Sequence, residues 1–230
     1  MRNNHGFSAK LTGWLFILAA VSSIIGLKLY DPILVDSNFL IAASNYEAQI
    51  IVGAVCELIL VASATGTGIM LFPLLKRYNE SIAVGYLGFR MLEVVFISIG
   101  TISILTALSI SKQYTTGIIK NAEDALNLML AFKSVYKWTF MIGPNFMLAI
   151  NTFIYSYALL KMNVIPVNLS RLGLVAAKLI MLAAFLELFG VINQISTWGI
   201  LLAIPIAFYE MTLAIWLIFK GIKTAPAVAR

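Results

Sequence analysis

Residues 82–110, IAVGYLGFRMLEVVFISIGTISILTALSI, decide the fold of this chain. The run is longer than the roughly 20 mostly apolar residues that a membrane-spanning helix needs. It nevertheless contains two charged residues, Arg90 and Glu93. Each charge costs roughly 2.5–3.5 kcal/mol near the centre of a membrane helix, and such groups persist where they face other helices, pair or line a wet cavity. The run therefore predicts a membrane helix with a polar interior face.

The composition of the whole chain also indicates a membrane protein. Of its 230 residues, 61% are hydrophobic and 11% are charged, whereas soluble domains have about 45–50% and about 25%. Six apolar runs are long enough to span a bilayer. We expect an all-α, polytopic protein of the plasma membrane, surrounded by lipids, with residues 1–230 forming one transmembrane domain. The predicted spans are residues 11–30, 46–75, 82–110, 138–160, 172–195 and 198–219.

The lysines and arginines outside the spans predict the orientation. The side with more of them is normally cytoplasmic, and it includes both termini, so we expect both termini in the cytoplasm. That side holds Arg2, Lys10, Lys76, Arg77, Lys161, Arg171, Lys220, Lys223 and Arg230, against Lys28, Lys112, Lys120, Lys133 and Lys137 on the other. The net charge of +6 does not indicate a nucleic-acid partner, because these cations lie in short loops rather than in one basic patch.

Two capping patterns predict where helices begin. Ser44 precedes Glu47 by three residues and predicts a capping box at the start of the second span. Asn121, with Asp124 three residues later, predicts the start of a helix before the fourth span. Apolar residues follow Asn121 at near-helical spacing, so we expect an extracytoplasmic amphipathic helix there. It would lie on the membrane surface or cap the bundle, and the functional alternative is a lid over a cavity.

Several kinds of site are excluded by what the chain lacks. Its single cysteine, Cys56, lies in an apolar run and cannot form a disulfide within the chain. Its single histidine, His5, precedes the first span, which excludes a haem or a histidine-ligated metal inside the membrane. The motifs of phosphate-binding loops, zinc proteases and serine hydrolases are absent. We expect no cofactor and no metal, and no catalytic residue is assigned.

Depth along the predicted helices groups the interior polar residues into two layers. Depth is counted at about 1.5 Å per residue from the cytoplasmic end of each span. Arg90 and Glu93 lie three residues apart, so they share a helix face and can pair. The layer from the inner third to the midplane holds Arg90, Glu93, Asn151, Lys178 and Glu210, and the outer layer holds Glu57, Asn145 and Glu187.

Prolines accompany two of these polar residues. Pro144 directly precedes Asn145, and Pro205 lies five residues before Glu210. A proline kinks a helix and frees a carbonyl, which neighbours or cavity water must then satisfy in a membrane. The simpler interpretation is a packing kink, and the functional one is a cavity with Asn145 and Glu210 on its wall. Glu57 and Glu210 have no opposite charge close by in their own helices, so each must find a partner across the bundle or take up a proton.

Four segments carry a resemblance to a known family: YDPIL, GFRMLEVVF, GPNFMLAINTFIYSYALLKMNVIP and FYEMTLAIWLIFKG. In these segments the chain resembles the bacterial and archaeal membrane family catalogued as domain of unknown function 4386, over nearly its whole length. The resemblance implies a six-span integral membrane protein without an assigned activity, and it supplies no catalytic roles. Arg90, Glu93, Asn151 and Glu210 match positions of the family pattern.

Three functions remain open at this stage. The first is a small transporter, or a binder of a small or lipid-like molecule, in which Glu210 exchanges a proton or cation, Arg90 contacts an anionic group and Glu93 is its counter-ion. The second is a membrane enzyme that acts on an isoprenoid or lipid through protonated carboxyl groups. The third is an assembly subunit whose charges fix only the packing. The sequence leaves open whether the chain forms homo-oligomers. The predicted polar cavity is lined by Arg90, Glu93, Glu210, Asn151, Asn145 and Glu57.

Overall fold

The computed structural model describes residues 4–193 and 196–223, and the side chains of residues 9–193 and 196–223. Arg2, Arg230 and the side chain of His5 lie outside this described part. Every regular element within it is a helix, which confirms the all-α class. In chain order the elements are α1 (Asn4–Leu29), α2 (Asp31–Leu34), α3 (Phe39–Asn45), α4 (Glu47–Tyr78), α5 (Glu80–Thr115), α6 (Ala122–Phe140), the π-helix η1 (Met141–Met147), α7 (Leu148–Met162), α8 (Val167–Leu188) and α9 (Thr197–Phe219).

Five of the described helices are long and apolar enough to cross a membrane: α1, α4, α5, α8 and α9. Each overlaps one of the predicted apolar runs. The fifth run, residues 172–195, differs most, because α8 spans Val167–Leu188 and residues 194–195 lie outside the described part. The remaining run, residues 138–160, lies in the end of α6, in η1 and in α7. These three elements follow one another without an intervening loop. The chain is therefore a multi-pass helical membrane protein.

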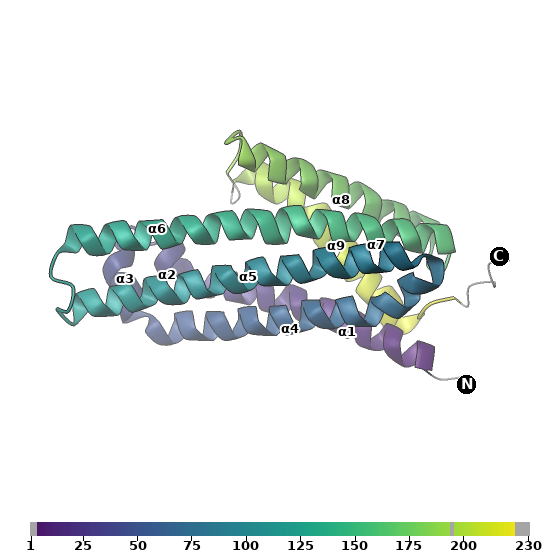
Figure 1. Ribbon diagram of the computed structural model, residues 1–230, viewed down its shortest axis with the longest axis horizontal. Coiled ribbons are helices and arrows are strands. Elements are labelled where there is room, and N and C mark those ends of the chain that lie inside the picture. The colour runs from purple at the N-terminus through teal and green to yellow at the C-terminus, as the bar shows by residue number, and fades with distance from the viewer. Residues whose placement is uncertain (1–3, 194–195, 224–230) are drawn as a thin grey trace.

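The helices form one elongated bundle in which α5 is the central element (Figure 1). Helix α5 packs against α4, α6, η1 and α7, while α1 packs against α4 and α9. The first described residues of α1 and the end of α9 lie at the same end of the bundle. The short helices α2 and α3 lie towards the opposite end, where α5 turns into α6 (Figure 1). This arrangement places the polar residues of α5 between helices from both halves of the chain.

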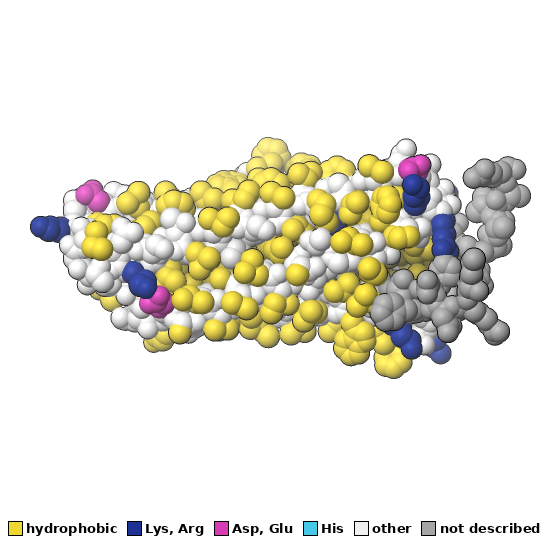
Figure 2. All heavy atoms as spheres, turned by 60° about the horizontal axis from the view of Figure 1, so that its bottom comes forward, with side chains coloured by type: hydrophobic (Ala, Val, Ile, Leu, Met, Phe, Trp, Pro, Cys, Tyr) yellow, Lys and Arg dark blue, Asp and Glu magenta, His cyan; other side chains and the backbone are white. Residues whose placement is uncertain are grey.

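The middle of the bundle surface is apolar, as a surface in contact with lipid should be. Hydrophobic side chains cover the middle of the face shown in Figure 2, and the charged side chains on that face gather towards its two ends. Large apolar residues such as Ile102, Phe208 and Ile215 are more than half exposed. In water they would cost roughly 25 cal/mol for each Å² of apolar surface left exposed. In a bilayer the same surface lies against acyl chains.

The two capping predictions have opposite outcomes. Asn121 caps α6 as predicted, because its side chain accepts a hydrogen bond of 3.0 Å from the backbone of Glu123. The capping box at Ser44 is wrong. Ser44 lies inside α3, where its backbone donates to the Ser111 hydroxyl at 2.9 Å and its own hydroxyl pairs with Thr115 at 3.0 Å. A contact between distant segments replaces the local cap and fastens α3 to α5.

Helix α6 covers the segment for which an amphipathic helix was predicted, and its buried residues pack against the bundle. Ala125 and Met129 are fully buried, in one cluster with Ile33 and Ile104. The helix runs alongside α5 and continues directly into η1 (Figure 1). Its apolar residues therefore extend the bundle core beyond the fourth apolar run.

Candidate functional site

The charged pair predicted on α5 is formed and is almost completely buried. Nη1 of Arg90 donates to Oε2 of Glu93 at 2.9 Å, and the two residues are 3% and 4% exposed. Nε of Arg90 donates to the carbonyl of Ala64 at 3.2 Å and to the hydroxyl of Thr67 at 3.1 Å, both on α4. The guanidinium is thus held between α4 and α5. Its position depends on groups that water does not reach.

Asn151 of α7 completes this network. Its side-chain amide donates to the same Glu93 oxygen that Arg90 contacts, and Asn151 is fully buried. Gly143 of η1 allows the close approach, because a Cβ there would lie 2.8 Å from Cβ of Phe96 and 3.3 Å from the Glu93 carbonyl oxygen. The Glu93 carboxylate therefore joins α5 to α7, and the guanidinium of Arg90 joins both to α4. Hydrogen bonds to such charged groups are the stronger kind.

Glu210 of α9 adds a second carboxyl group to this layer. It interacts electrostatically with both Arg90 and Glu93. Its Oε1 atom is buried and has no hydrogen-bond partner among the described residues. A single guanidinium thus lies near two carboxyl groups, and only Glu93 is hydrogen-bonded to it. One cation cannot balance two carboxylates, so this arrangement can hold one exchangeable proton or cation at Glu210.

A stack of buried tyrosines beside these residues was not predicted. Tyr86 and Tyr155 meet edge to face with ring centroids 5.7 Å apart, and Tyr155 stacks on Tyr209 at 6.0 Å. The Tyr209 hydroxyl pairs with that of Ser156 at 2.8 Å. The spacing of the tyrosines in the sequence could have predicted this stack. Each tyrosine lies four residues from Arg90 or Asn151 on the same helix, or directly beside Glu210.

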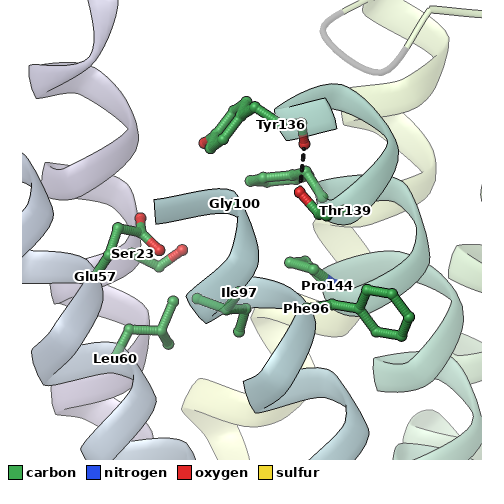
Figure 3. Close-up of a pocket in the computed structure, with 10 residues that line it drawn as sticks. Ser23, Glu57, Leu60, Phe96, Ile97, Gly100, Tyr136, Thr139 and Pro144 are labelled. Carbon is green, nitrogen blue, oxygen red and sulfur yellow. Dashed lines mark hydrogen bonds between the residues drawn. The ribbon is translucent and has the colours of Figure 1, made fainter. Parts of the chain in front are cut away.

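Glu57 lies apart from this network, at a small cavity between α1, α4, α5, α6 and η1 (Figure 3). The cavity has a volume of about 10 Å³, which is room for about one water molecule. It is lined by Ser23, Glu57, Leu60, Phe96, Ile97, Gly100, Tyr136, Thr139, Phe140 and Pro144. Arg90, Glu93, Asn151 and Glu210 do not line it.

Asn145 lies apart from the Arg90 network and contacts another carboxyl group. Its amide donates to Oε2 of Glu187 at 2.9 Å and connects η1 to α8. Lys178, which shares the depth of the inner layer, is exposed on α8. The structure thus brings Arg90, Glu93, Asn151 and Glu210 together, and it places Glu57 and Asn145 at separate positions. Across the described ranges, no three His, Cys, Asp or Glu side chains form a group that could hold a metal ion.

These features define a class: a helical integral membrane protein with a buried ionic network that connects α4, α5 and α7. The chain belongs to the family described as Domain of unknown function (DUF4386), whose model matches residues 11–221. This confirms the resemblance seen in the four sequence segments. No curated protein and no solved structure gives a significant match to the chain.

Proposed function

We propose that the protein is a small transporter, or a binding protein for a small or lipid-like molecule, and that it works through Arg90 and Glu210. The observation that supports this most is the buried Oε1 atom of Glu210, which lacks a hydrogen-bond partner near a guanidinium already paired with Glu93. Unpaired polar atoms inside a membrane are costly. A site that exchanges a proton, a cation or a ligand accounts for that cost.

Each member of the network has a proposed role. Glu210 exchanges a proton or a small cation. Arg90 contacts an anionic or carboxylate group of the ligand, since a guanidinium presents several donors in a fixed plane. Glu93 is the counter-ion that keeps Arg90 in place, and Asn151 orients that carboxylate. Pro205 lies one turn or more from Glu210 inside α9, where the missing backbone donor makes the helix easier to bend.

The proposal includes a topology of six spans. The fourth is the continuous helix formed by the end of α6, η1 and α7, which carries the apolar run 138–160. Six crossings agree with α1 beginning and α9 ending at the same end of the bundle (Figure 1). The excess of lysine and arginine indicates that this end faces the cytoplasm, with the bundle in the plasma membrane. Helices α2, α3 and most of α6 then lie at the extracytoplasmic end.

The first test is ligand binding by the purified protein in detergent. A library of small ions, metabolites and lipid-like compounds is scanned for an increase in thermal stability of wild type, Glu210→Gln, Arg90→Gln and Glu80→Gln. Glu80 is the matched control, because it is an exposed carboxylate at the start of α5 that pairs only with Lys76 in the described structure. We expect the stabilising compounds to act on wild type and Glu80→Gln alone. Equal stabilisation of folded Glu210→Gln would contradict the proposal.

One observation favours a second candidate, in which the charges fix only the helix packing. Arg90, Glu93 and Asn151 are 3%, 4% and 0% exposed, so the network is closed to ligands in this conformation. Buried hydrogen bonds between membrane helices contribute about 0.6 kcal/mol each on average. If the charges serve only packing, any loss of binding in Glu210→Gln should come with a matching loss of stability. A folded, equally stable Glu210→Gln variant that no longer binds ligand distinguishes the two.

A further inference from the structure

We propose that Glu57 forms a second site, separate from the Arg90 network, that binds one water molecule and an exchangeable proton. This goes beyond the function proposed above, which assigns no role to Glu57. The site is the small cavity of Figure 3, where Glu57 and Ser23 lie on one side and Tyr136 and Thr139 on the other. Its volume of about 10 Å³ is about the smallest that holds one water molecule.

The Glu57 carboxyl group has no protein hydrogen bond in the described structure to satisfy it. Glu57 is 6% exposed, and neither an ion pair nor a hydrogen bond of its side chain is present among the described residues. The carboxyl group lies against α1, because a Cβ on Gly26 would be 2.7 Å from Oε1 of Glu57. A carboxylate buried without a partner is so costly that it normally takes up a proton. The missing partner is therefore one that the cavity supplies.

The cavity walls offer the partners that one water molecule needs, which are two to four polar groups. The Tyr136 hydroxyl is buried and has no hydrogen-bond partner within the described residues. Ser23 from α1 adds a second hydroxyl. Thr139 donates its proton to the carbonyls of Val135 and Tyr136, so its oxygen can still accept. A water here can bridge the Glu57 carboxyl group to these hydroxyls.

None of the described groups that face Glu57 carries a positive charge. Tyr136 of α6 and Tyr30, at the end of α1, interact with it electrostatically, and Cys56 precedes it on α4. On α5, the buried Thr101 lies next to Gly100 of the cavity wall. Lys28, at the end of α1, is exposed and paired with Asp31. Without a facing cation, the carboxyl group can become neutral inside the bundle only by binding a proton, which it exchanges with the cavity water.

An apolar layer separates this site from the Arg90 network. Ala19, Leu60 and Ile97 form a buried cluster, and two of them also line the cavity. On α5, Ile97 lies one turn beyond Glu93 and Gly100 about two turns beyond it, a rise of about 10 Å. Polar groups on either side of an apolar layer form two proton-accepting positions at different depths. The Glu57 site is thus independent of the ligand site proposed at Glu210.

The test is infrared spectroscopy of the purified protein in lipid, transferred from H₂O to D₂O. A protonated carboxyl group gives a carbonyl stretching band that shifts in D₂O once its proton exchanges. We expect wild type and Glu210→Gln to share one such band that Glu57→Gln lacks. Raising the pH should remove that band, and lowering it again should restore it. A wild-type spectrum in which Glu57→Gln removes no band at any pH would overturn the proposal.

A second variant tests the cavity without changing Glu57. In Gly100→Ala the new Cβ would lie 3.0 Å from Oγ1 of Thr139 and 3.4 Å from Cδ2 of Tyr136, so it occupies the space for water. Gly88→Ala on the same helix is the control, because a Cβ there meets nothing within 4 Å. We expect Gly100→Ala to keep the Glu57 band and to slow its exchange at least tenfold relative to Gly88→Ala. Equal exchange rates would overturn the role of the cavity. Thermal stability that rises with NaCl but not with choline chloride, and only when Glu57 is present, would show a sodium site instead.

Discussion

Replacing Arg90 and Glu93 with methionine, singly and together, measures how strongly the central ion pair is coupled. Both side chains are almost completely buried, at 4% and 6% exposed, so water screens their interaction little. Removing one partner of a buried pair leaves the other charge uncompensated and costs about 3–5 kcal/mol. Removing both leaves the amide of Asn151 unsatisfied, at about 1–3 kcal/mol, and leaves one carboxyl group, that of Glu210, without a cation instead of two. We therefore expect the double variant to be less destabilised than Arg90→Met.

The order of the single variants is also predicted. In Glu93→Met the guanidinium keeps its contacts with α4 and the nearby carboxyl group of Glu210. In Arg90→Met two carboxyl groups remain without a cation. The free energy of unfolding should therefore fall more for Arg90→Met than for Glu93→Met.

The assay is reversible unfolding by SDS in lipid–detergent micelles, followed by circular dichroism. The control pair is Lys76 and Glu80, which lie 2.7 Å apart but have side chains that are 52% and 67% exposed. Such a surface pair contributes about 0–1 kcal/mol, and its single variants should add. If Arg90→Met costs no more than Lys76→Met, or if the two central substitutions add, the reasoning about the buried network is wrong.

Three further predictions follow from individual contacts. Gly173→Ala should destabilise the protein by about 1–3 kcal/mol, because a Cβ there overlaps the Ser156 hydroxyl and the Tyr209 ring; thermal unfolding checks this against Gly88→Ala, which should be nearly neutral. Asn121→Ala should cost about 1 kcal/mol through loss of the α6 cap, whereas Asn127→Ala on the exposed side of α6 should not, as SDS unfolding will show. In a Cys56→Ser background, Lys120→Cys should react with an impermeant maleimide in intact cells and Lys161→Cys only after permeabilisation; the reverse pattern would invert the proposed topology.

The helices were predictable because the lipid environment acts directly on composition. A span must be apolar over about 20 residues whatever its neighbours are, and the runs in residues 11–30 and 198–219 coincide closely with α1 and α9. That α6, η1 and α7 form one continuous helix was harder to foresee. Pro144 indicates a break at the fourth run, yet η1 absorbs it with π-helical turns, and the chain stays helical from Ala122 to Met162. Local propensity does not reveal whether packing will hold two segments on one axis.

The sequence predicted the depth of the central polar residues along their spans, but not the direction in which their side chains point. Counting residues along each span places Arg90, Asn151, Glu210 and Lys178 at one depth. Depth does not fix the angle around the helix axis. Lys178 is therefore exposed, whereas Arg90 and Asn151 are buried and Glu210 has one buried carboxyl oxygen. The partner of Asn145 also depends on the angle around the helix axis. Glu187 and Glu57 have similar depths, and Asn145 is hydrogen-bonded to Glu187.

The most direct test of the account is flux into proteoliposomes of the compounds that stabilise the wild-type protein. Wild type, Glu210→Gln and Glu80→Gln are reconstituted at equal density, and folded protein is quantified in each preparation. We predict uptake by wild type and Glu80→Gln, and at least a tenfold loss in folded Glu210→Gln. Uptake by Glu210→Gln at the wild-type rate would contradict the claim that the unpaired carboxyl group beside Arg90 is the functional centre.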